Sequence, residues 1–314
     1  MDVLYIANHV VFSLFITLFL VEIGMAFTGM LFYELYPTIK KYLIPMWEIN
    51  GTFAIFYIVS FEAIYPKLLI SVGFLYLVPV MFAALLFILR NAFISYSEYA
   101  NNVTSKKTYF MVYSISTLII GFLVISIFSS AMSGIGININ TNTIYLLQFL
   151  FNPFNILIFV SLVLLGFCIT AIVLSINKMR ISASVSLFTS ILIGLIGIST
   201  YTKYLLNNIF GDIWILYSLV IILLITLFTL ILYIKKVQIS NKLILPATFF
   251  IILIISISQY PYVYGNQLYI NTYLTQSVNQ VPIMYITTFG ILFLSISISY
   301  LIYVYNKKEI IKEK

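Results

Sequence analysis

Three glutamates lie inside long apolar stretches of this sequence: Glu22, Glu48 and Glu62. A fourth, Glu34, lies at the edge of the first stretch. A charged side chain at the centre of a bilayer costs at least about 2.5–3.5 kcal/mol, so such residues usually face a bundle interior and often serve proton or ion transfer. These carboxyl groups are therefore the first candidates for chemistry, as members of a proton path.

The spacing around two of these glutamates places them on one helix face. Glu48, Gly51, Ile55, Ile58 and Glu62 follow one another at intervals of three and four residues, which is the period of one side of a helix. The two carboxyl groups are then about 21 Å apart along the axis. We expect Gly51 to let a neighbouring helix approach closely.

Each glutamate also has a structural interpretation without proton transfer. Glu48 can lie solvated at the membrane interface, Glu22 can be hydrogen-bonded to a neighbouring helix, and Glu62 can pair with Lys67. Trp47 precedes Glu48 directly, so it either lines a quinone or proton entrance, together with Asn50, or anchors the helix at the interface.

The composition indicates what kind of protein must position these residues. The chain has 314 residues, of which 62% are hydrophobic and 8% charged, whereas a soluble domain carries about 25% charged residues. So few charges cannot cover a solvated surface, so we predict an all-α, polytopic membrane protein that forms one integral membrane domain over residues 1–314.

Nine apolar stretches are close to the length of about 20 residues that a membrane-spanning helix needs. The predicted helices cover residues 7–33, 48–65, 68–92, 108–131, 149–175, 182–204, 213–234, 243–260 and 281–305. The two longest links on one side, 132–148 and 261–280, are free of charge, so we expect them to lie on the membrane or on a partner.

The basic residues alternate with these spans. Fourteen of them fall in the odd-numbered links and the C-terminal tail, whereas only Lys67 and Lys203 fall in the even-numbered links. Because basic residues favour the cytoplasmic side, this pattern predicts an external N-terminus and a cytoplasmic C-terminus in the cell membrane. The net charge of +7 is then mainly a signal of orientation, and a nucleic acid partner is not expected.

The sequence offers little to bind a cofactor. It has one histidine, His9, which cannot supply the pair of axial histidines typical of membrane b-type haems, although a His/Met pair remains an alternative. Its one cysteine, Cys168, lies in an apolar run and is interpreted as a buried core residue. No metal-binding spacing, phosphate loop or catalytic triad is present. We therefore expect no metal site and no catalytic centre within this chain alone.

Several patches carry a family resemblance. The stretch "PMWEINGTF", with its apolar continuation to Pro66, resembles the start of the second helix in subunit II of cytochrome bd-type quinol oxidases. Trp47, Asn50 and Pro66 match at the family's spacing, and Glu48 stands where that family has Asp. Arg90 fits a cytoplasmic Arg after the third helix. Two later stretches, "LLQFLFNPFNILIF" and "SQYPYVYGNQLYINTYLT", are also similar to the family, through Gln148, Asn152, Pro153, Phe154, Pro261, Val263, Asn271, Leu274 and Thr275.

The resemblance implies a fold and a function. The fold would be two four-helix bundles plus one peripheral helix. The function would be that of the haem-free subunit II of a quinol:oxygen oxidoreductase, in a heterodimer whose subunit I holds haems b and d and oxidises quinol. A bound quinone is compatible with the family as well. The acidic residue after Trp lies on a cytoplasmic proton path in the family, and this role carries over to Glu48.

Two other functions are consistent with the same residues. A proton-coupled transporter could use the intramembrane carboxyl groups, although paired Gly/Pro interruptions at matching positions are not seen. A purely structural membrane scaffold is the third candidate. Copurification with a haem-bearing partner distinguishes the oxidase subunit from both.

Overall fold

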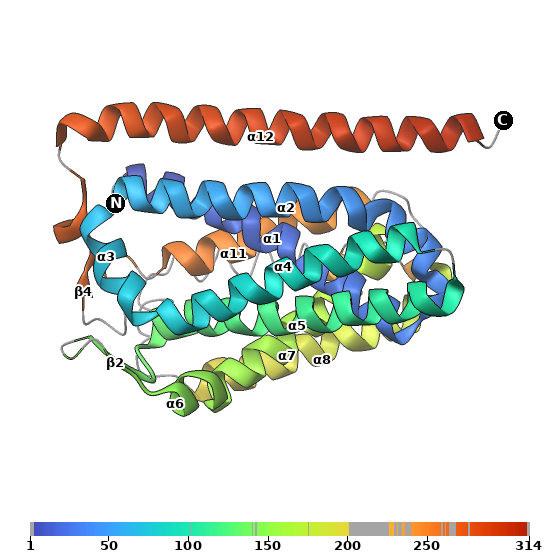
Figure 1. Ribbon diagram of the computed structural model, residues 1–314, viewed down its shortest axis with the longest axis horizontal. Helices are drawn as coiled ribbons and strands as arrows, with labels where there is room; N and C mark the ends of the chain where they lie inside the picture. Colours follow the sequence, from blue (N-terminus) through green and yellow to red (C-terminus); the bar gives the residue numbers. More distant parts are fainter. Residues whose placement is uncertain are drawn as a thin grey trace.

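The protein is described here by a computed structural model, which is almost entirely helical (Figure 1). The description covers residues 3–312 except for 101, 140, 142, 175, 201–225, 229–230, 232–233, 236–239, 259, 261, 264–267 and 276. Seven of the described helices are long and apolar enough to cross a membrane. The prediction of a helical, polytopic membrane protein is therefore confirmed at this level.

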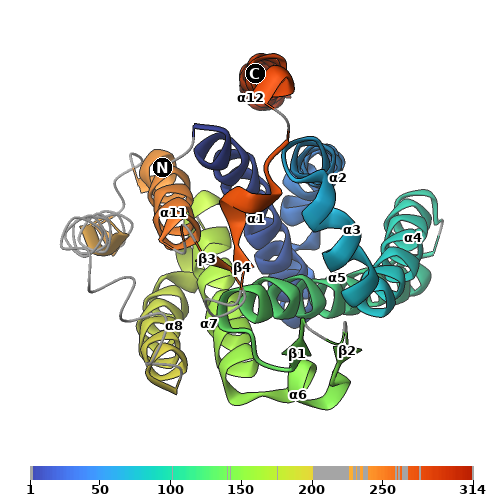
Figure 2. The same ribbon diagram turned by 90° about the vertical axis from the view of Figure 1, so that its left-hand side faces the viewer.

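Helix α1, Val3–Leu31, is the central element of the molecule. It packs against α2, α5, α7, α11 and α12, and the end-on view in Figure 2 shows it surrounded by these helices. Gly24 allows the crossing with α7, because a Cβ atom there would lie 2.0 Å from the carbonyl oxygen of Gly166. Since α1 is enclosed, a charged side chain in its middle depends on neighbouring helices for its partners.

Helix α2, Tyr36–Ile64, follows the short 3-10 helix η1, Tyr33–Leu35. The predicted span 48–65 was too short, because α2 begins twelve residues earlier. Its first turns already bury Tyr36, Ile39 and Leu43 in the main core cluster, and Pro37 occupies the start of the helix, where a missing N–H is harmless. Buried residues recur at helical spacing along one side of α2, whereas the opposite side is exposed.

The predicted span 68–92 is two helices rather than one: α3, Pro66–Leu75, and α4, Leu77–Tyr99. The break falls at Tyr76, whose hydroxyl lies 2.8 Å from Ser130 Oγ and whose ring packs near Phe149. Helix α5, Val103–Ser133, packs along α4 and ends at Gly134 in the left-handed conformation (φ 70°).

The link 132–148 forms a small hairpin, β1 (Ile137–Asn138) and β2 (Thr143–Ile144), followed by α6, Leu146–Phe151. The link 261–280 holds a second hairpin, β3 (Tyr262–Val263) and β4 (Leu268–Tyr269), followed by η3, Ile270–Tyr273. Neither hairpin was predicted from the sequence. Both lie at the same end of the molecule as the N-terminus (Figure 1).

The remaining described helices are α7, Pro153–Val173, η2, Asn177–Met179, α8, Arg180–Thr200, and α11, Ser240–Ile257. Helix α7 packs against α1 and α8. Helix α12, Ser277–Lys312, runs along the outside, contacts α1 and α2, and ends at the opposite end of the molecule from the N-terminus (Figures 1 and 2). Its 36 residues extend for about 54 Å, more than the roughly 30 Å of a hydrocarbon core.

Eight of the nine predicted spans thus coincide with described helices, with changed boundaries. The seventh, 213–234, lies almost wholly outside the described residues. The apolar part of α11, Leu243–Ile257, is shorter than a usual span.

Candidate functional site

A buried network centred on Glu22 joins four helices. The Glu22 side chain, from α1, is 0% exposed. Arg90 Nη1, from α4, lies 2.8 Å from its Oε1. The Tyr113 hydroxyl, from α5, donates to Oε1 at 2.7 Å, and Asn50 Nδ2, from α2, donates to Oε2 at 2.8 Å. One side chain from each of α1, α2, α4 and α5 therefore meets at a single carboxylate.

The local sequence explains why these four side chains converge. Asn50 and Phe53 belong to the buried side of α2, which faces α1. Arg90, Ile94 and Ser97 form the short buried face of α4, which packs on α5. Because a membrane offers these side chains no hydrogen-bond partners, buried polar groups at this level satisfy one another across the four helices.

The network pairs one formal negative charge with one positive charge. Glu22 receives hydrogen bonds from three donors, and the Arg90 guanidinium also lies over the Phe87 ring, with Cζ 4.6 Å from the ring centroid. A buried carboxylate needs this kind of compensation, since removing charges from water costs several kcal/mol per ion. The two charges thus cancel, and the site is an ion pair enclosed by the bundle.

Arg90 corrects one expectation from the sequence. It was assigned to a cytoplasmic link, but its side chain is only 1% exposed and pairs with Glu22. Thirteen basic residues then remain on the side predicted to be cytoplasmic. Sequence reasoning also missed Tyr113. The sequence did offer a signal for Arg90. This residue lies at the end of one apolar stretch, and Glu22 lies inside another.

Glu48 is close to Asn50 in the sequence, but its side chain lies on another side of the helix. It lies two residues from Asn50, a rotation of about 200° around the helix, and is exposed. Trp47 lies three residues from Asn50, on the same side, and packs against the main core cluster. The structure therefore brings Trp47 and Asn50 to the side of Glu22, and places Glu48 on the opposite side of α2.

The five residues predicted to share one face of α2 form an outward-facing stripe. Ile55 is 66% and Ile58 55% exposed, and Glu48 and Glu62 are exposed at its two ends. Gly51 is half-buried, and among the described residues a Cβ there would meet Phe87 Cζ alone, at 3.6 Å. The expected close helix approach at Gly51 is therefore wrong, since this is an ordinary contact distance.

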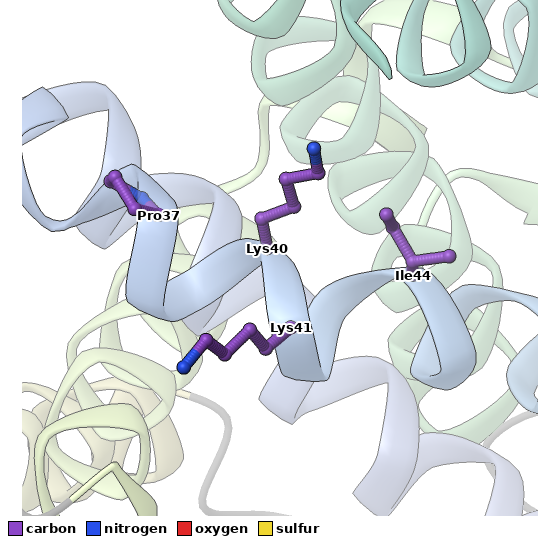
Figure 3. Close-up of a pocket in the computed structure, with 4 residues that line it drawn as sticks. All are labelled: Pro37, Lys40, Lys41 and Ile44. Atoms are coloured by element: carbon purple, nitrogen blue, oxygen red, sulfur yellow. The ribbon is translucent and has the colours of Figure 1, made fainter. Parts of the chain in front are cut away.

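An open hollow at the start of α2 is lined by Pro37, Lys40, Lys41 and Ile44 (Figure 3). The two lysine side chains extend in different directions, and Lys40 Nζ lies 2.5 Å from Glu98 Oε2. Both partners are partly exposed, at 29% and 39%, so this pair lies at a solvent-accessible end of the bundle. Glu48 lies eight residues further along α2, about 12 Å along the helix axis.

The described residues include the one histidine of the chain, His9. They contain no group of three His, Cys, Asp or Glu side chains that could hold a metal ion. The ring of His9 packs against Tyr5, with centroids 3.9 Å apart, and its Nδ1 donates to the Tyr5 carbonyl oxygen at 2.8 Å.

The fold and the buried network define a multi-pass helical membrane protein whose polar core is an ion pair. A comparison with family models matches residues 2–307 to cytochrome bd terminal oxidase subunit II, and the chain belongs to that family. It is thus a component of a haem-containing oxidase of the respiratory chain.

A solved structure is similar over nearly the full length. The chain matches a structure described as bd oxidase from Geobacillus thermodenitrificans with a TM-score of 0.69 and 18% identity, covering 97% of this chain and 99% of that one. This likeness shows the shared fold. A comparison with curated proteins gives no match.

Proposed function

We propose that this chain is the haem-free subunit II of a cytochrome bd-like quinol:oxygen oxidoreductase. It would form a heterodimer with a subunit that holds haems b and d and oxidises quinol, support that subunit in the membrane, and contribute to proton uptake. Family membership supports the assignment, and a single histidine cannot supply the axial pair of a bis-histidine haem.

The position of Glu48 is the observation that carries the proposal. It is an exposed carboxyl group on an apolar helix face, about 12 Å along the helix axis from Lys40, which pairs with Glu98. Exposure to lipid at that depth would be costly. Coverage by a second membrane subunit with hydrogen-bond donors or basic groups removes this cost. We therefore assign Glu48 to the partner-facing surface, where it takes up protons and passes them towards the partner.

The other candidate residues have supporting roles in this proposal. Glu22 lies inside the bundle, and its network keeps a polar connection between α1, α2, α4 and α5 on the side of α2 opposite the Glu48 stripe. Trp47 and Asn50 line the cytoplasmic approach to Glu22. Glu62 lies two residues before the end of α2, so we assign it to the outer end of the same partner-facing stripe.

The membrane arrangement follows from charge and topology. We propose nine transmembrane helices, as two four-helix bundles and the peripheral α12, within one membrane domain over residues 1–314. The N-terminus and both hairpins lie at one end of the molecule, and the C-terminus at the other (Figure 1). Basic residues gather at the latter end, which supports a cytoplasmic C-terminus in the plasma membrane.

The decisive experiment measures quinol-dependent oxygen consumption by the purified complex. Glu48→Gln keeps the shape and the hydrogen bonding of the side chain but removes the exchangeable carboxyl proton. Turnover should fall roughly tenfold or more, as for a positioned proton-transfer group, while haem content stays unchanged. Glu34→Gln is the matched control, because Glu34 is also exposed but lies in η1, outside the stripe.

Two results would contradict the proposal. Equal turnover in the Glu48→Gln and wild-type complexes would remove the proton role of Glu48. Purification of the chain as a stable, haem-free protein with proton-coupled uptake activity, and without a pigmented partner, would instead support a transporter.

A further inference from the structure

Several buried polar atoms around the Glu22 network have no hydrogen-bond partner among the described residues. They are Arg90 Nη2, Asn50 Oδ1, Trp47 Nε1 and Ser114 Oγ. Arg90 and Asn50 both contact the Glu22 carboxylate directly. Trp47 lies one turn from Asn50 on the same side of α2, and Ser114 follows Tyr113 on α5. Arg90 Nη2 and Asn50 Oδ1 are therefore the unmatched atoms at the carboxylate itself, and Trp47 and Ser114 lie next to the network along α2 and α5.

The orientation of Asn50 is fixed by its charged neighbour. Its Nδ2 must face Glu22 Oε2, since a flipped amide would place two acceptor oxygens against each other. Asn50 Oδ1 consequently points away from the carboxylate as an acceptor with no donor. Arg90 in the same way uses Nη1 on Glu22 and leaves Nη2 as a donor with no acceptor.

We infer that this region holds at least one resident water molecule. A water molecule accepts two hydrogen bonds and donates two, which suits donors at Arg90 Nη2 and Trp47 Nε1 and acceptors at Asn50 Oδ1 and Ser114 Oγ. Buried waters typically make about three such bonds to polar groups that would otherwise be unsatisfied. Without water, Arg90 Nη2 and Asn50 Oδ1 would both be buried and unmatched on side chains that bind one carboxylate, which native proteins avoid.

The water site extends the network towards Trp47, which lies beside Glu48 in sequence. It thereby gives Glu22 a hydrogen-bonded connection along the buried side of α2 towards the end where Lys40 lies. This consequence rests on the proposed proton role, whereas the existence of the water site does not.

A density map of the intact wild-type complex, at a resolution that shows ordered water, tests the site itself. We expect density within hydrogen-bond distance of Arg90 Nη2 and Asn50 Oδ1. A dry, closed region between these side chains would overturn the inference. This measurement is independent of any variant and of oxygen consumption.

A second experiment tests what the water does. Trp47→Phe removes one N–H donor and keeps an aromatic ring, so the map should show the water displaced or weakened while the Glu22–Arg90 pair is retained. Met46→Leu is the control, because Met46 packs against the same core cluster without a polar group. Unchanged water density in Trp47→Phe would overturn the assignment of Trp47 as its donor.

Turnover then separates the water site from the proton route. A severalfold fall in oxygen consumption in Trp47→Phe, but not in Met46→Leu, supports water on the route. If the water is displaced in Trp47→Phe but turnover is unchanged, the water site is supported and its role in proton uptake is contradicted.

Discussion

Arg90 and Glu22 form a fully buried ion pair, with Nη1 and Oε1 2.8 Å apart and side chains 1% and 0% exposed. The pair joins α4 to α1, two helices with few other contacts, and its two remaining bonds reach α2 and α5. A buried charge needs its counter-charge in place when the bundle assembles. The pair therefore specifies how these four helices are rotated relative to one another.

The first prediction concerns removal of one member of this pair. Arg90→Met leaves Glu22 as an uncompensated buried charge, and such losses cost about 3–5 kcal/mol. We expect a sharp drop in the yield and thermal stability of the complex, measured by haem absorbance after solubilisation at increasing temperatures.

The double variant Glu22→Gln/Arg90→Met is the matched test of this cause. It removes both charges, so it should be more stable than Arg90→Met alone, and a double-mutant cycle gives the coupling energy. Equal destabilisation by the single and double variants would show that the packing, and not the charge, is what matters at this site.

The second prediction concerns Tyr113, whose hydroxyl donates to Glu22 Oε1. Tyr113→Phe removes one hydrogen bond to a charged group, which contributes about 1.5–3 kcal/mol. The midpoint of thermal unfolding of the complex should fall. Tyr109→Phe is the control. Tyr109 lies on α5 like Tyr113, but its ring packs with Phe93 and Tyr96 of α4. Equal shifts in both variants would refute a specific role for the Tyr113 hydroxyl.

Much of the fold could be predicted from apolar length alone, because an enclosed helix in a membrane protein is apolar on all sides. The sites where prediction failed depend on tertiary contacts. The break at Tyr76 is stabilised by its contacts with Ser130 and Phe149, which lie far along the chain. The early start of α2 depends on the burial of Tyr36, Ile39 and Leu43.

The candidate site was predictable only in part for the same reason. The high cost of a charge in an apolar stretch singled out Glu22 and Glu48 without any structure. The partner of Glu22 could not be deduced, because the choice among basic residues depends on how α1 and α4 are rotated. Likewise, the spacing placed Glu48 and Glu62 on one face of α2, but only the packing shows that this face points outwards.

The third prediction concerns the crossing of α1 and α7 at Gly24 and Gly166. A Cβ on residue 24 would lie 2.0 Å from Gly166 O and 2.6 Å from Thr170 Oγ1, so backbone would have to move. Gly24→Ala should destabilise the complex by about 1–3 kcal/mol or more. Gly73→Ala in α3 is the control, since no atom of the described residues lies within 4 Å of a Cβ there. A Gly24→Ala complex with normal thermal stability would contradict the close approach of these helices.

The last prediction compares two asparagine caps that differ in burial. Asn152 is 8% exposed; its Oδ1 accepts from Asn155 N at 2.9 Å, and its Nδ2 donates to the Gln148 carbonyl at 3.0 Å, so it fixes both sides of the α6–α7 break. Asn102 caps α5 in an exposed position, accepting from Thr104 N at 3.2 Å.

Loss of an N-cap costs about 0.5–2 kcal/mol, and at a buried site the unmatched backbone groups add a further penalty of about 1–3 kcal/mol each. We therefore expect Asn152→Ala to lower the thermal stability of the complex clearly more than Asn102→Ala does. Thermal unfolding curves of both variants, recorded side by side by haem absorbance, measure the difference. If the exposed cap proved the more important of the two, the α6–α7 break would be held by the packing of its apolar residues rather than by the Asn152 side chain.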